Sequence, residues 1–157
     1  MAVCLVGAAL CAPARAQSVR GQSTLAFTVA ETTDFEVEGA PQVTISGLDS
    51  WTESADGAAS YSLVTNKGTP KDITISLDQA PPPGLAFEAY VEAPASNGRG
   101  ATSAGWTALD TDEQVVVQNV QKVNDSGVPI SYRARASAET APDTYVLTVN
   151  YTISAAN

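Results

Sequence analysis

Apolar and polar residues alternate with a period of two along much of this chain, and no segment shows the three-and-four spacing of a helix. Such alternation predicts β-strands, whose successive side chains point to opposite faces. We expect strands around residues 25–29, 35–37, 43–45, 58–65, 73–77, 85–91, 106–109, 115–120, 130–136 and 145–153. The chain is therefore predicted to be all-β.

Turn residues separate these predicted strands and indicate how they connect. Residues 66–70 (NKGTP) predict the turn of a hairpin, and residues 124–127 (NDSG) predict a second turn. Residues 81–84 (PPPG) predict a stiff connector between two sheets, and the Gly- and Ser-rich residues 93–105 an exposed loop. About nine short strands at this spacing favour an antiparallel immunoglobulin-like β-sandwich, with a closed barrel as the alternative.

The first sixteen residues, MAVCLVGAALCAPARA, have the features of a secretory signal peptide. An apolar run precedes Ala14-Arg15-Ala16, which places small residues at the two positions that a signal peptidase recognises. The run is shorter than the roughly 20 residues of a membrane-spanning helix. We expect residues 1–16 to be cleaved and residues 17–157 to form one secreted or cell-surface domain. No basic residue precedes the run, which leaves the true start codon open and a buried N-terminal element as the alternative.

The composition removes most catalytic chemistry. The chain has no histidine, and its two cysteines, Cys4 and Cys11, belong to the predicted signal peptide. Histidine- or cysteine-dependent catalytic sets, thiol redox centres and ordinary zinc or haem sites are therefore excluded from the mature domain. Eight basic and 17 acidic residues become seven and 17 once Arg15 is lost, a net charge of −10. Such a surface repels nucleic acid and anionic membranes.

Carboxylate chemistry and a Ser–Lys dyad remain as candidates, but the frequent serines and the lysines in turn-like segments locate no such dyad. Glu36 and Glu38 flank Val37 and are expected to form the solvated side of an edge strand. Asp110, Asp112 and Glu113 lack the glycine and distal glutamate of a calcium-binding loop, so a solvated acidic turn is expected there. We therefore predict no catalytic, cofactor-binding or metal-binding residues, and a carboxylate-dependent hydrolase is the least favoured hypothesis.

Two tryptophans are candidates for ligand recognition. Trp51 and Trp106 lie near predicted strand ends, where their rings, with Tyr90, could stack on the sugars of a polysaccharide. The competing interpretation is that a sandwich without disulfides uses a buried tryptophan as a central packing group.

The closing segment, residues 141–153 (APDTYVLTVNYTI), resembles the last strand of exported pilin-like β-sandwich domains, in the style of spore coat protein U and the archaic chaperone–usher pilins. This resemblance implies a subunit of a surface filament or coat, in which an extended N-terminal segment of one copy completes the sheet of the next. Residues 17–31 are the candidate donor strand, and Leu25, Phe27 and Val29 are the side chains that would enter a neighbour's groove. The alternative is that this strand pairs within its own domain.

The sequence thus favours a secreted, non-enzymatic structural protein that assembles with copies of itself or with other surface subunits. The second hypothesis is a polysaccharide- or ligand-binding adhesion module that uses the exposed aromatic residues. Neither hypothesis requires a cofactor.

Overall fold

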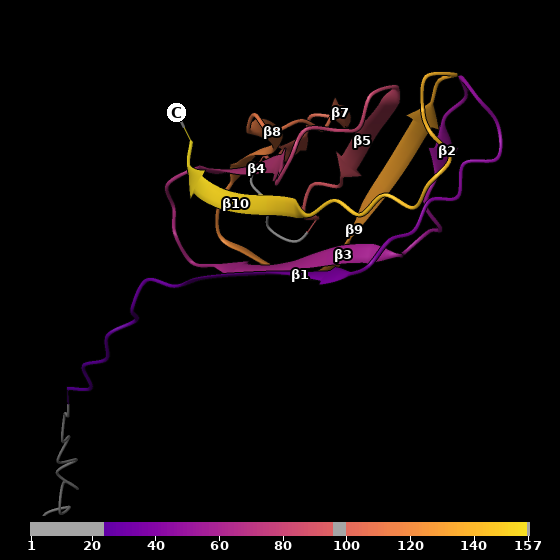
Figure 1. Cartoon of the computed structure of the whole chain (residues 1–157). Coiled ribbons are helices and arrows are strands. Elements are labelled where there is room, and N and C mark those ends of the chain that lie inside the picture. The colour runs from indigo at the N-terminus through magenta and orange to yellow at the C-terminus, as the bar shows by residue number, and fades with distance from the viewer. Residues whose placement is uncertain (1–23, 96–99, 157) are drawn as a thin grey trace, which may run out of the picture.

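Two layers of antiparallel β-sheet make up the fold, and no helix occurs in the residues described by the computed structural model, 24–95 and 100–156 (Figure 1). The predicted signal peptide lies outside these residues. The strands are β1 (Thr33–Gly39), β2 (Thr52–Glu53), β3 (Ala59–Thr65), β4 (Lys71–Leu77), β5 (Leu85–Val91), β6 (Thr102–Ser103), β7 (Trp106–Ala108), β8 (Gln114–Val120), β9 (Val123–Ala136) and β10 (Val149–Ala155). The all-β prediction is confirmed.

The larger sheet has the strand order β1-β3-β9-β5-β7, with β2 paired to β9, and the smaller sheet has the order β10-β4-β8-β6. The long strand β9 organises the larger sheet, because β3 and β2 share one of its sides and β5 occupies the other. The two sheets are separate and have free end strands, so the chain does not form the closed barrel that was the alternative. The end strands β1 and β10 are each paired on one side only.

The core lies between the two sheets and follows the predicted alternation. In β3, Ala59, Tyr61 and Leu63 are buried, while Ser60 and Ser62 between them are half-buried on the opposite face. Tyr61 is the largest fully buried side chain; its ring is 5.8 Å from that of Phe35, and its hydroxyl donates to the Glu92 carbonyl at 2.7 Å. A tyrosine therefore takes the central packing position that the sequence offered to a tryptophan.

Two of the predicted turns are wrong. Residues 66–70 do not close a hairpin, because β3 belongs to the larger sheet and β4 to the smaller one. Residues 124–127 lie within β9, where the pairing with β3 shifts register between Tyr61 and Leu63. Gly127 has a φ of +65° there. The turn-like residues 124–127 thus accommodate a β-bulge, in which β9 carries one residue more than β3. The connector at residues 81–84 does join the two sheets, as predicted.

Three segments that alternate like strands are not strands. Residues 25–29, 43–45 and the first part of the predicted last strand, 145–148, have no strand partner among the described residues. Their alternation persists: Val43, Ile45 and Leu147 are half-buried, while Thr44 and Thr148 are exposed. Residues 25–29 and 43–45 therefore have the sequence of β-strands without backbone hydrogen bonds to a neighbouring strand among the described residues. Within the described part of the chain, the backbone of residues 145–148 is hydrogen-bonded only at Val146 and Thr148, to residues 78–79.

Buried phenols should make stability sensitive to alkaline pH. Burial raises the pKa of Tyr61, Tyr132 and Tyr151 above the ordinary value of 10.0. The unfolded chain ionises these groups near pH 10 and the folded chain does not, so their contribution is complete below pH 10 and is lost as the pH rises above it. The free energy of unfolding should fall by about 1.4 kcal/mol per pH unit for each phenol that stays protonated. Urea unfolding from about pH 8 to about pH 11 measures this, and a flat profile would contradict it.

Candidate functional site

An open groove lies between the two sheets, on the side of the end strands β1 and β10. Its volume is about 1170 Å³. One wall is the extended segment that follows β1, residues 40–48, and the other is the segment that leads into β10, residues 141–148. The large apolar side chains that line it are Val37, Val43, Ile45, Leu48, Leu77, Leu85, Phe87, Leu109, Val146, Leu147 and Val149.

The two walls of the groove differ in their backbone hydrogen bonds. In the wall at residues 141–148, the Val146 carbonyl accepts from the Gln79 side chain and the Thr148 carbonyl accepts from the Asp78 amide. In the part of the chain that the structure describes, residues 40–48 make no backbone hydrogen bond to any strand. The edge of β10 that faces away from β4 is also unpaired. The groove is thus a strand-shaped opening between two edges that can still form hydrogen bonds.

Two tyrosines lie at the floor of the groove. Tyr132 of β9 and Tyr151 of β10 come from different sheets, and their hydroxyls are hydrogen-bonded to each other. Burial keeps both phenols protonated well above their ordinary pKa. This contact joins the two sheets within the lining of the groove.

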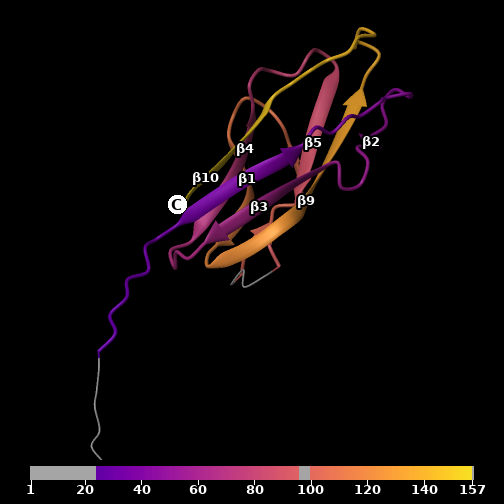
Figure 2. The same ribbon diagram turned by 90° about the horizontal axis from the view of Figure 1, so that it is seen from below.

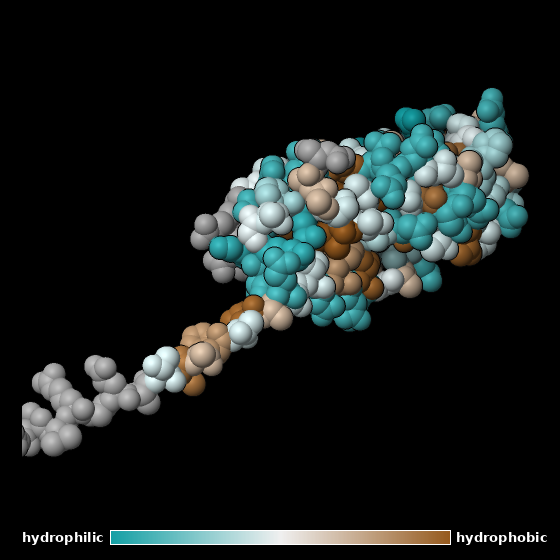
Figure 3. All heavy atoms as spheres, turned by 90° about the vertical axis from the view of Figure 1, so that its left-hand side faces the viewer, coloured by the Kyte–Doolittle hydropathy of each residue, from teal (hydrophilic) through white to brown (hydrophobic). Residues whose placement is uncertain are grey.

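A tail precedes β1 and extends away from the sandwich (Figures 1 and 2). Residues 24–32 belong to no strand, and every one of them is exposed. The side chains of Leu25, Phe27 and Val29 are 84%, 81% and 75% exposed. Figure 3 shows brown and pale spheres alternating along the projecting tail. The described part of the predicted donor segment therefore forms no strand within its own domain, which was the alternative.

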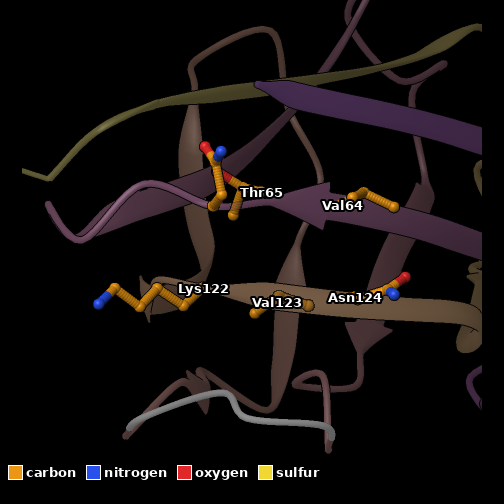
Figure 4. A pocket seen from close by; sticks show the side chains of 6 residues that line it. Val64, Thr65, Lys122, Val123 and Asn124 are labelled. Carbon is orange, nitrogen blue, oxygen red and sulfur yellow. The ribbon is translucent and has the colours of Figure 1, made fainter. Parts of the chain in front are cut away.

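The base of the tail is held by the residues that follow β3. The Asn66 side chain accepts from the Thr32 amide at 2.9 Å and donates to the Ala30 carbonyl at 2.7 Å. Lys67 forms an ion pair of 2.9 Å with Glu31. Beside this attachment lies a shallow hollow of about 310 Å³ (Figure 4). It is lined by Val64, Thr65, Asn66, Lys122, Val123 and Asn124.

The two candidate tryptophans lie together on the outer face of the larger sheet, and both are half-buried. The Arg133 guanidinium is 4.3 Å from the ring centre of Trp106 and 4.7 Å from that of Trp51. Arg135 is 5.0 Å from Trp51, and the Tyr90 ring is 5.8 Å from Trp106. Tryptophan and arginine thus alternate across the sheet. Guanidinium groups lie over both rings, and neither tryptophan belongs to the core cluster of buried residues.

Arg133 should stabilise this outer face. Its Nε donates to Glu88 at 2.7 Å, and both side chains are only about one-fifth exposed. Arg133→Ala removes the ion pair and two cation–π contacts, so we expect a loss of about 1–3 kcal/mol in the free energy of unfolding. Arg133→Lys should not restore it, because an ammonium lacks the planar face that stacks on the rings. Arg135→Ala at the exposed end is the control, and equal losses for the two alanine variants would contradict this interpretation.

The acidic residues are dispersed. Asp110 accepts a hydrogen bond from the Thr111 amide at 2.7 Å, as in a turn. Glu36 and Glu38 lie on the exposed face of β1. Within residues 24–95 and 100–156, no three potential metal ligands gather at one place, and no helix has the length and apolar character needed to cross a membrane.

Comparison with known proteins gives no relative for this chain. No family model, no curated protein sequence and no solved structure matches it. The geometry of the groove, the tail and the aromatic face is therefore the basis for the functional proposal.

Proposed function

We propose that this protein is a secreted structural subunit that assembles with copies of itself by β-strand complementation. The tail of one copy, with residues 24–29 as its described part, enters the groove between β1 and β10 of the next. The observation that carries this proposal is the presence of two strand-like segments that pair with no strand among the described residues. Residues 43–45 line the groove, and residues 25–29 project into solvent.

The tail and the groove match in character. Beyond its attachment at Asn66, the described tail at residues 24–29 carries Leu25, Phe27 and Val29 at alternate positions, and residues 40–48 form one wall of the groove. An inserted strand would bring its backbone to the free edge of β10 and place Leu25, Phe27 and Val29 among the apolar residues of the groove. Burying each of these side chains contributes about 1.5–3 kcal/mol. In this proposal the sandwich is immunoglobulin-like with one strand position open.

The proposal also includes export of the protein. The predicted signal peptide would deliver the domain to the outside of the cell, where a subunit without cysteine depends on packing and strand pairing for its stability. The proposed role is structural and not enzymatic.

Electron microscopy and sedimentation of the purified chain test the proposal. We expect linear head-to-tail polymers whose length increases with protein concentration, and loss of these polymers when residues 17–31 are deleted. A chain that stays monomeric at every concentration would contradict the proposal.

The second candidate, a polysaccharide-binding module, has weaker support because Arg133 and Arg135 occupy the stacking positions at the tryptophans. Titration with neutral and acidic polysaccharides, followed by tryptophan fluorescence, tests it. A saturable change in emission would favour this candidate.

A further inference from the structure

The Asn66 side chain continues the ladder of hydrogen bonds between β1 and β3 beyond the end of β3. The backbone pairing of these strands ends at Thr33 opposite Thr65. Asn66 follows immediately, but its side chain rather than its backbone meets the tail. It accepts from the Thr32 amide and donates to the Ala30 carbonyl, at 2.9 and 2.7 Å. A carboxamide carries one acceptor and one donor group, so it can replace a backbone unit of a neighbouring strand.

Further contacts hold the same stretch of the tail. The Thr65 hydroxyl donates to the Thr32 carbonyl at 3.2 Å and lies 3.0 Å from the Thr33 hydroxyl. The ion pair between Lys67 and Glu31 adds a further contact, but the Glu31 side chain is 74% exposed. An ion pair this open to water contributes little. Asn66, which fixes the backbone on both sides of Glu31, is therefore the main restraint on the direction of the tail.

The direction so fixed leads away from the domain's own groove. The tail is attached at Thr33, the first residue of β1, whereas the groove begins at Val37 and continues past the end of that strand to Leu48. Both views of the molecule show the tail leaving the body at its β1 end (Figures 1 and 2). A tail that filled its own groove would have to reverse at Thr33, which breaks both hydrogen bonds to Asn66.

We infer that Asn66 is a positioning residue that presents the tail to a neighbouring copy and opposes its return to its own groove. This inference rests on the proposed function. In it, one side chain decides whether the tail binds the groove of a neighbouring copy or its own groove. Both of these Asn66 hydrogen bonds go to the backbone at the base of the tail and not to the side chains proposed to enter the groove.

Distance measurements between two spin labels test the restraint itself. Residues 17–157 contain no cysteine, so Thr28→Cys, two residues from the restrained Ala30, and Ser126→Cys provide the only attachment points. In the monomer fraction we expect a narrow distribution of distances with Asn66 present and a broad one with Asn66→Ala. Asn66→Asp keeps the acceptor for Thr32 but loses the donor to Ala30, so its distribution should be intermediate. An unchanged distribution for Asn66→Ala would overturn the inference.

The growth rate of the unlabelled polymer tests whether the restraint by Asn66 directs assembly. We expect Asn66→Ala to slow growth at least about tenfold, as loss of two hydrogen bonds can, and the exposed amide variant Gln118→Ala on β8 to grow normally. A broadened distribution with normal growth would show that the restraint does not direct assembly. Failure of the unmodified chain to polymerise would instead overturn the proposed function, while the spin-label distances would still report on the restraint.

Discussion

Phe27→Asp should abolish polymer growth and leave the folded domain intact. The Phe27 side chain is 81% exposed and contacts no core residue, so its removal should change the free energy of unfolding by less than about 0.5 kcal/mol. In the proposed assembly the same ring is buried in a neighbour's apolar groove. Losing about 2–3 kcal/mol of burial weakens the contact by roughly 30- to 150-fold, and a desolvated carboxylate weakens it further.

Thr28→Asp is the matched control, because it adds the same charge one position along the tail. Successive side chains of a strand point to opposite faces, so residue 28 should face away from the groove. Thr28→Asp should therefore form polymers at close to the normal rate. Light scattering during growth, with a thermal melt of each variant, measures both effects. Equal loss of growth in the two variants would indicate a general effect of charge and not a strand held in a defined register.

Tyr61→Ala should produce the largest loss of stability in the domain. The ring is 1% exposed, packs against Phe35 and carries the hydrogen bond to the Glu92 carbonyl. Truncating a buried aromatic residue to alanine costs about 3–5 kcal/mol, because the cavity is refilled only in part. Tyr61→Phe removes only the hydroxyl and should cost about 1 kcal/mol.

Urea unfolding measures these losses against Val64→Ala in the same strand. Val64 is 39% exposed on the opposite face of β3, and its truncation should cost far less than that of Tyr61. Similar losses at the two positions would mean that the core is not centred on Tyr61.

The sequence predicted the strands well where both neighbours of a strand belong to the same chain. Residues 58–65, 73–77 and 85–91 alternate as expected and form β3, β4 and β5. Alternation identifies the buried face of a strand but not its partner. That is why the hairpin predicted at residues 66–70 is instead a crossing between two sheets.

The sequence was least accurate at the proposed site, and the physical reason is the same. Residues 25–29 and 43–45 carry the pattern of strands, yet a strand also requires a hydrogen-bonded neighbour, which the described residues of the single chain do not supply. The aromatic face was missed for a different reason. Arg133 and Arg135 give no pattern in the sequence that connects them to Trp51, which lies about 80 residues earlier.

Asn66 shows the limit of what local sequence can indicate. In the sequence Asn66 is one residue of a turn-like run, NKGTP. Asparagine is common in turns because of the backbone conformations that it tolerates. In the structure its side chain binds the backbone at Ala30 and Thr32, more than 30 residues away. Only the pairing of β1 with β3 brings these segments together.

Disulfide trapping tests the central claim, that the tail of one copy occupies the groove of another. Val29→Cys in the tail is combined with Leu147→Cys or Val43→Cys on the two walls of the groove, in a mature chain that otherwise lacks cysteine. A disulfide forms only when the two Cα atoms approach within about 7 Å. The proposed assembly predicts a ladder of covalent multimers on a non-reducing gel, and reducing agent should collapse the ladder to monomer. A covalently closed monomer, or no disulfide at either wall, would contradict the claim.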